Sequence, residues 1–198
     1  MPRFTRPLII LAAFLVGLVV AFAVVTWLAN SGRDAKSIST IVIGGPFNLV
    51  RHDGAAVDEK ILKGKPTLMF FGFTHCPDIC PTALFEMSEI MRALGNDADR
   101  TQAFFVSVDP ERDTPAQLKL YLSSFDPHIS GLTGSDSQIA QVVKNFRVYA
   151  KKVPLKDGDY TMDHTALVYL FDREGRFIAP FNMKRKPDEA AADLRRYF

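Results

Sequence analysis

An uninterrupted apolar run near the N-terminus constrains this chain more than any other feature of its sequence. Residues 8–29 form a 22-residue stretch with only two non-apolar members, and no charged residue lies between Arg6 and Arg33. A helix that rises about 1.5 Å per residue over this stretch crosses a hydrocarbon layer about 30 Å thick. We therefore predict one transmembrane helix over residues 8–30, preceded by a short cytoplasmic tip, residues 1–7.

The charges around this run predict its orientation. The formal net charge of the 198 residues is +2, and Arg3 and Arg6 together account for it. Basic residues before a span favour a cytoplasmic N-terminus and an exported remainder. A cleaved signal peptide is the alternative, but its apolar core is usually about 7 to 15 residues long and ends near an Ala-x-Ala site, which the end of this run lacks. We expect a single-pass protein of a bacterial inner membrane whose body faces the periplasm.

The rest of the chain has the composition of one ordinary globular domain. Hydrophobic residues make up 47% and charged residues 23% of the sequence, near the averages for folded proteins. Without the two N-terminal arginines the chain carries no net charge, which argues against nucleic-acid binding. We expect a short polar stalk over residues 31–40 and a single domain over residues 41–198.

The domain alternates expected strands and helices. Apolar runs at 67–73 and 103–108 are typical of strands buried on both faces. Turn residues at 52–54 and 172–175 predict two hairpins. The helical spacing of apolar residues predicts the helices 81–94, 114–125, 135–148 and 188–197. This order predicts an α/β domain with a mixed central sheet flanked by helices.

The two cysteines, Cys76 and Cys80, lie where the first buried strand meets the first helix, the end of an α/β sheet at which sites usually form. Pro81 disfavours helical backbone at the preceding residue, so we expect Cys80 to cap the helix and Pro81 to begin it. The positive end of the helix dipole predicts that both thiols ionise more readily than a free cysteine. A structural disulfide is the alternative, but closing so short a loop stabilises little. The pair is therefore expected to be functional.

Two soft thiolates suit Cu(I), whereas a structural zinc ion requires four protein ligands. A third ligand is therefore expected among the histidines. His52 and His128 occupy turn and loop positions typical of solvated side chains, and His75 adjoins Cys76 in an extended segment where neighbours point apart. Three methionines fall on buried strand or helix positions and are expected to be core residues: Met69, Met87 and Met91.

His164 ends a polar loop and leads directly into an apolar strand. From the local sequence, a hydrogen-bonded loop histidine and a metal ligand are both open. Asp163 would either orient the imidazole as a hydrogen-bonding neighbour of the site or simply end the loop.

Three motifs together resemble the Sco/SenC family of copper chaperones, which assemble the CuA centre of cytochrome c oxidase. The motifs are Phe-Thr-His-Cys-Pro-Asp-Ile-Cys-Pro at 73–81, Ser-Val-Asp-Pro-Glu-Arg-Asp-Thr-Pro at 107–115 and Asp-His-Thr at 163–165. The resemblance covers residues 41–198 and includes the single N-terminal anchor. On its own, the second motif is expected to be a solvated loop before a helix cap, with partner docking as the alternative.

The resemblance implies a thioredoxin-like fold with copper, as Cu(I) and/or Cu(II), bound by Cys76, Cys80 and His164. It also implies docking to the oxidase subunit that carries CuA, and a further periplasmic copper chaperone is a candidate partner. We expect a membrane-anchored copper metallochaperone. One alternative is a thiol-disulfide oxidoreductase in which Cys76 and Cys80 form the redox pair that keeps the CuA cysteines reduced. A thiol peroxidase is a weaker alternative, supported only by Thr74 as an activating residue. Enzymatic activity therefore stays open.

Overall fold

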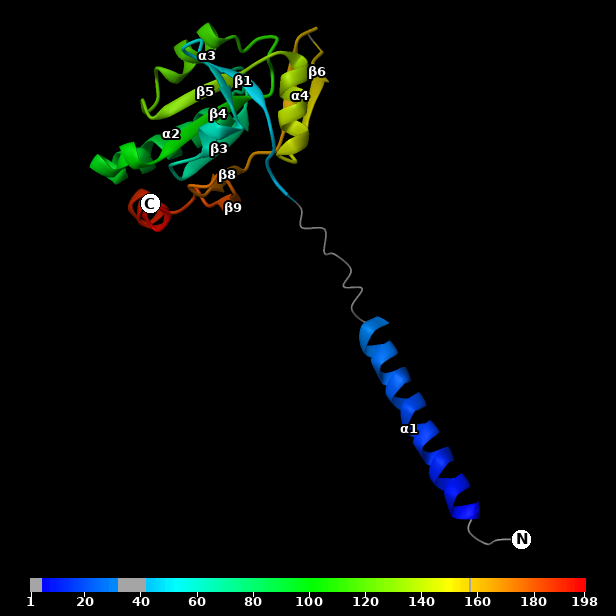
Figure 1. The fold of residues 1–198 in the computed structure, drawn as a ribbon. Coiled ribbons are helices and arrows are strands. Elements are labelled where there is room, and N and C mark those ends of the chain that lie inside the picture. Colours follow the sequence, from blue (N-terminus) through cyan, green and yellow to red (C-terminus); the bar gives the residue numbers. More distant parts are fainter. Residues whose placement is uncertain (1–4, 32–41, 157) are drawn as a thin grey trace. The chain divides into compact units, whose positions relative to one another are not determined.

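The computed structural model describes residues 5–31, 42–156 and 158–198. The chain divides into two compact units, Met1–Ile41 and Val42–Phe198 (Figure 1). Residues 1–4 of the expected tip and 32–40 of the expected stalk lie outside the described residues.

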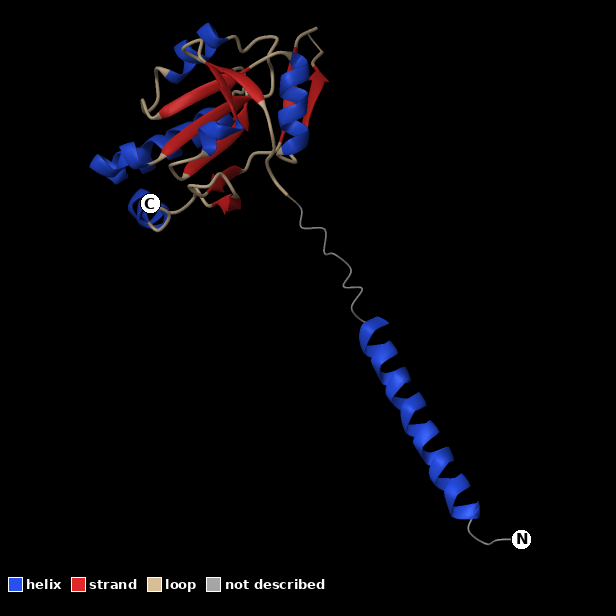
Figure 2. Ribbon diagram, viewed as in Figure 1, coloured by secondary structure: helices blue, strands red, loops and turns tan. Residues whose placement is uncertain are grey.

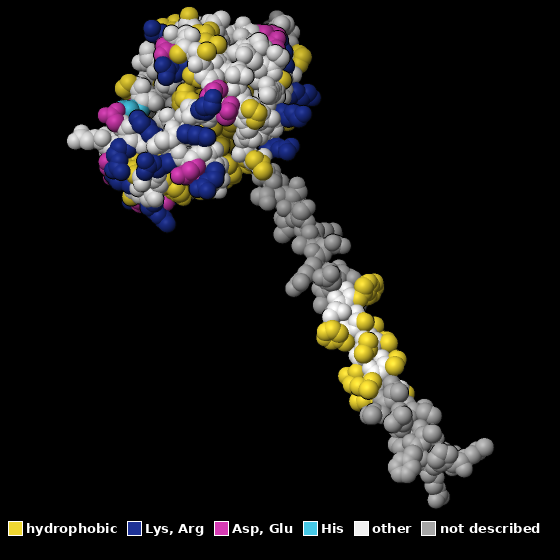
Figure 3. Space-filling view, in the orientation of Figure 1, with side chains coloured by type: hydrophobic (Ala, Val, Ile, Leu, Met, Phe, Trp, Pro, Cys, Tyr) yellow, Lys and Arg dark blue, Asp and Glu magenta, His cyan; other side chains and the backbone are white. Residues whose placement is uncertain are grey.

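The described residues of the first unit form helix α1 (Thr5–Ser31). Its described side chains, residues 13–27, are all exposed, and Figure 3 shows apolar side chains along its surface. Within the described part of the chain, no helix is both long and apolar enough to span a membrane. The predicted helix is therefore present, while the transmembrane span predicted over residues 8–30 stays a prediction.

The second unit is built on a seven-stranded mixed sheet with the strand order β2-β1-β5-β4-β3-β8-β9. Its strands are β1 (Asn48–Arg51), β2 (Ala56–Asp58), β3 (Thr67–Gly72), β4 (Gln102–Ser107), β5 (Ile129–Thr133), β8 (Val168–Phe171) and β9 (Phe177–Phe181). The three central strands β3, β4 and β5 run parallel, and the remaining pairs are antiparallel. The predicted mixed sheet, its two hairpins and its two buried apolar strands are confirmed.

Helices surround this sheet (Figure 2). They are α2 (Ile79–Leu94), α3 (Pro115–Leu122), α4 (Asp136–Asn145) and α5 (Pro187–Arg195), with short 3-10 helices at Glu59–Leu62 and Gly95–Arg100. Helix α2 packs with α5, α3 lies against β5, and α4 lies against β1. Every residue of β3 is buried, so the strand that leads to the cysteines lies in the centre of the core.

The start of α2 differs from the prediction. Asp78 is the N-cap and the helix begins at Ile79, so Cys80 is its second residue and Pro81 its third. The first four N–H groups of a helix have no partner within it, so a proline in this turn costs no hydrogen bond. Cys80 therefore lies inside the first turn instead of capping it.

Strands β6 (Ala150–Pro154) and β7 (Tyr160–His164) form a separate two-stranded antiparallel sheet, with Ala150 opposite His164. The prediction of a polar loop leading to His164 was wrong, because this segment is a strand whose polar side chains hide the usual apolar alternation. His164 is the last residue of β7. In the part of the chain that the structure describes, the two sheets are not joined by ladder hydrogen bonds.

Candidate metal centre

Two sulfur atoms and one imidazole nitrogen, from Cys76, Cys80 and His164, lie within 4.8 Å of one another. Cys80 Sγ is 3.5 Å from His164 Nε2. Among the described residues this is the only group of three or more histidine, cysteine or acidic side chains close enough to hold a metal ion. The fold thus brings together the three side chains that the sequence predicted as copper ligands.

The two cysteines differ in their exposure. Cys76 lies in the loop between β3 and α2 and is half-buried, whereas Cys80 is 0% exposed. Both are free thiols, and the Cys80 backbone N–H points to Cys76 Sγ at 3.4 Å. The first turn of α2 therefore closes around the Cys76 sulfur, and solvent reaches the pair from the Cys76 side.

The prediction of easily ionised thiols was wrong for Cys80. Loss of hydration on burial raises the pKa of the Cys80 thiol, and the nearby Cys76 sulfur raises it further. Burial outweighs the helix dipole here because Cys80 faces the core from inside the helix. A cation bound between the two sulfurs would favour the Cys80 thiolate and take the place of the thiol proton.

Gly72, the last residue of β3, makes room for the Cys80 sulfur. A Cβ atom at this position would lie 2.7 Å from Cys80 Sγ and 2.7 Å from Phe105 Cε2. A side chain at residue 72 would therefore displace the Cys80 thiol. Gly72 was not among the residues predicted to form the site, although a glycine inside a buried strand is a signal of close approach by another group.

The His164 imidazole is held by two aromatic rings and one carbonyl group. It packs edge-on against Phe73, at 5.7 Å and 89°, and against Phe70 at 6.2 Å. Its Nδ1 atom lies 3.1 Å from the Thr165 carbonyl oxygen. Since a carbonyl oxygen only accepts, Nδ1 carries the proton and Nε2 keeps its lone pair beside Cys80. The Asp163 side chain is exposed, so the oxygen that contacts the ring is that of Thr165.

The other candidate ligands lie outside this group. His52 Nδ1 accepts a hydrogen bond of 2.8 Å from the Gly131 N–H, and burial lowers the pKa of His52. His128 is 2.7 Å from an Asp126 oxygen, and exposed His75 is 3.1 Å from a hydroxyl oxygen. Both His52 and His128 are half-buried rather than fully solvated. The three methionines predicted as core residues are buried: Met69, Met87 and Met91.

The loop between β4 and α3 contains two buried carboxylates, which corrects its interpretation as a solvated loop. Asp109 is 3% exposed and Asp113 is 0% exposed. Asp113 accepts hydrogen bonds from the Thr74 N–H at 3.1 Å, the Thr74 hydroxyl at 2.6 Å and the Ser107 hydroxyl at 2.6 Å. Burial raises the pKa of Asp113. This carboxylate anchors the segment that leads to Cys76.

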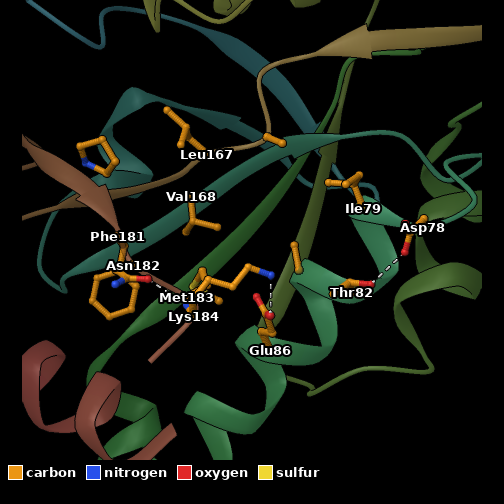
Figure 4. A pocket seen from close by; sticks show the side chains of 13 residues that line it. Asp78, Ile79, Thr82, Glu86, Leu167, Val168, Phe181, Asn182, Met183 and Lys184 are labelled. Atoms are coloured by element: carbon orange, nitrogen blue, oxygen red, sulfur yellow. Dashed lines mark hydrogen bonds and ion pairs between the residues drawn. The ribbon is translucent and has the colours of Figure 1, made fainter. Parts of the chain in front are cut away.

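A cavity of about 590 Å³ lies beside the metal centre, between the first turns of α2, residues 166–168 and the end of β9. Figure 4 shows Ile79 and Leu167 among its apolar lining, and a Lys184–Glu86 ion pair of 3.1 Å beside them. None of the three residues of the metal centre lines it. It nevertheless adjoins both segments that carry them, because Ile79 precedes Cys80 and residue 166 follows shortly after His164.

A mixed sheet flanked by helices, with two cysteines where a central strand meets a helix and a histidine beside them, is the arrangement of a thioredoxin-like protein with a candidate metal site. The SCO1/SenC family model matches residues 35–198, and the chain belongs to this family.

Known relatives agree with this assignment. The chain is 44% identical over 147 residues to the mitochondrial SCO1 homolog 1 of Arabidopsis thaliana, a match that covers 74% of this chain and 44% of that protein. The structure of Bradyrhizobium japonicum ScoI with copper bound is 68% identical, with a TM-score of 0.77 over 79% of this chain and 99% of that one. BsSco is 27% identical, with a TM-score of 0.62 over 78% and 92% of the two chains.

The relatives' descriptions connect the family with copper and with oxidase assembly. BsSco is described as a member of the Sco family of cytochrome c oxidase assembly proteins, in which a disulfide switch was identified. Copper is bound in the Bradyrhizobium structure. This chain is therefore a copper-binding protein of the Sco family with a clustered Cys-Cys-His group.

Proposed function

We propose that this protein is a copper metallochaperone that binds copper through Cys76, Cys80 and His164 and delivers it to the CuA site of cytochrome c oxidase. The observation that carries the proposal is the approach of two sulfurs and one imidazole nitrogen to within 4.8 Å. Two thiolates and one imidazole form a soft set of three donors, which suits Cu(I) and is one ligand short of a structural zinc site. Copper in either oxidation state is the cargo.

The unequal burial of the two cysteines supports release of copper from one side of the site, the side of Cys76. Cys76 is half-buried and Cys80 is fully buried, so a thiol of an acceptor protein meets the Cys76 sulfur first. The Thr165 carbonyl holds the proton on Nδ1 of His164 and leaves Nε2 free for the cargo. Exchange of one ligand at a time, beginning at Cys76, then moves copper without releasing it into water.

The proposed partner is the oxidase subunit that carries CuA, with a further periplasmic copper chaperone as the donor. The family's association with oxidase assembly supports the acceptor. We also propose a single N-terminal anchor in a bacterial inner membrane, with the domain in the periplasm; the apolar run at 8–29 and the arginines before it support this location. Protease added outside spheroplasts should degrade the domain, and protection of the domain would contradict the topology.

A second candidate function is reduction of the acceptor's cysteines. It is favoured by the short separation of the two free thiols. In this reaction Cys76 and Cys80 form a disulfide while a client disulfide becomes two thiols, so two electrons and two protons pass to the client. A peroxidase is not favoured, because the Thr74 hydroxyl donates to Asp113 and is not free to activate a cysteine.

Anaerobic titration of the reduced full chain with Cu(I) tests the three-ligand site. Cys76→Ser, Cys80→Ser and His164→Ala should each weaken binding, whereas His75→Ala, a neighbouring histidine outside the group, should not. Unchanged affinity in His164→Ala would overturn the site. Two incubations then separate delivery from reduction. Copper-loaded protein with a reduced CuA domain tests delivery, and metal-free protein with an oxidised CuA domain tests reduction.

A further inference from the structure

The two halves of the metal centre belong to different sheets. Cys76 and Cys80 follow β3 of the seven-stranded sheet, whereas His164 ends β7 of the separate two-stranded sheet. Among the described residues, no ladder hydrogen bonds join the two sheets. The distance between the imidazole and the sulfurs is therefore not set by strand pairing. It depends on the short link from β7 to β8, on the Thr165 carbonyl and on side-chain contacts.

Arg112, in the loop between β4 and α3, contacts the start of β7. Its Nη1 donates to the Tyr160 carbonyl oxygen at 3.0 Å, and its guanidinium lies 3.7 Å from the centre of the Tyr160 ring. Its Nε donates to the buried Asp109 carboxylate at 2.5 Å, and the Tyr160 hydroxyl donates to the same carboxylate at 2.8 Å. These contacts fix both the main chain and the ring of the first residue of β7, the strand that ends at His164.

The same guanidinium also contacts the cysteine side of the centre. It lies 5.8 Å from the centre of the Phe73 ring, the ring against which the His164 imidazole packs edge-on at 5.7 Å. The next residue, Asp113, accepts the Thr74 N–H and hydroxyl. Two consecutive residues, Arg112 and Asp113, thus contact both segments of the metal centre.

We infer that Arg112 is a positioning residue that sets the place of His164 relative to the cysteine pair, acting through Tyr160 and Phe73. The expected effect on copper binding rests on the proposed function, whereas the contacts that Arg112 makes do not depend on that function. The planar guanidinium is required because it makes a fork of hydrogen bonds and stacks on a ring at the same time, which an ammonium group cannot do.

The test compares Arg112→Gln and Arg112→Lys with Lys152→Gln in the full chain. Lys152 is the matched control, because its ammonium lies 3.8 Å from the centre of the same Tyr160 ring and pairs with the exposed Glu111 carboxylate. In the metal-free protein, NMR cross-relaxation between the His164 and Phe73 ring protons should be lost in both Arg112 variants and kept in Lys152→Gln. Cu(I) affinity should fall by about 10- to 100-fold in the Arg112 variants only.

Each outcome decides the inference. A folded Arg112→Gln protein that keeps both the ring contact and the affinity overturns it, and so does full rescue by Arg112→Lys, because charge alone would then suffice. If Arg112→Gln does not fold, Tyr160→Leu, at a half-exposed position, removes the stacked ring and should cause the same losses. Failure of the unaltered protein to bind Cu(I) would contradict the proposed function, while the metal-free NMR comparison would still test the positioning.

Discussion

The Cys80 sulfur and the His164 Nε2 atom lie 3.5 Å apart, although 84 residues separate them in the chain. Neither residue reaches this position by local structure alone. Cys80 is placed by the first turn of α2, and His164 by the end of the β6–β7 hairpin and the Thr165 carbonyl. The donor set is therefore a property of the folded chain, and changes that shift either segment should weaken copper binding.

Gly72→Ala should weaken copper binding and lower stability together. The added methyl group would lie 2.7 Å from Cys80 Sγ, so the sulfur or the helix turn must move, and overpacking of this kind costs about 1 to 3 kcal/mol of unfolding free energy. Gly131→Ala is the matched control, because its methyl group would meet Leu122 at 2.9 Å on another part of the sheet. Chemical unfolding and competition with a Cu(I) chelator measure the two effects. Equal copper affinities for both variants would contradict this role of Gly72.

Asp113→Ala should loosen the loop that leads to Cys76. It removes the acceptor of three hydrogen bonds from Thr74 and Ser107 and leaves buried donors unsatisfied, which should lower the free energy of unfolding by about 3 kcal/mol. Cu(I) affinity should fall by about tenfold or more. Glu111→Ala, an exposed carboxylate in the same loop, should leave both quantities nearly unchanged. If the two variants bind copper equally well, Asp113 does not support the metal centre.

Much of the fold could be predicted because strands β3 and β4 are continuous apolar runs and helices α3 and α4 begin at clear caps. Thr114 and Ser135, the first residues of the predicted helices 114–125 and 135–148, accept hydrogen bonds from the third residue of their helices. Strand β5 was missed, because Ser130 and Gly131 interrupt its apolar pattern. Strands β6 and β7 were missed for a related reason: β6 carries two consecutive lysines, Lys151 and Lys152, and Asp163 of β7 is polar and exposed.

The three residues of the candidate metal centre were predicted mainly through the family resemblance, and their surroundings were not. Local sequence cannot reveal that Asp113 is buried, because its partner Thr74 lies 39 residues away. It also cannot show that the burial of Cys80 outweighs the helix dipole, because this depends on how the first turn of α2 faces the core. Gly72 is the exception, since its place inside a buried strand was a signal available from sequence alone.

The free energy of unfolding should depend on pH through His52, which lies in the turn between β1 and β2. Burial lowers the pKa of His52, and its neutral Nδ1 accepts the Gly131 N–H. A depressed folded-state pKa means that the contribution is fully present above the unfolded pKa of about 6.5 and is lost as the pH falls through the folded value. His52→Asn keeps an acceptor that cannot be protonated. Urea unfolding of both proteins from pH 7.5 to pH 5 should show a loss of about 1 kcal/mol in the unaltered protein that the variant lacks.

Tyr121→Phe should stabilise the domain. The Tyr121 hydroxyl is buried and, among the described residues, has no hydrogen-bond partner, and its burial raises the pKa of this group. Removing an unsatisfied hydroxyl should raise the free energy of unfolding by about 1 kcal/mol, and the melting temperature by about 2 to 4 °C. Tyr160→Phe is the matched control with the opposite sign, because the Tyr160 hydroxyl donates to the Asp109 carboxylate at 2.8 Å. Calorimetry of the two variants tests the pair, and a lower melting temperature for Tyr121→Phe would show that its hydroxyl makes a stabilising contact in solution.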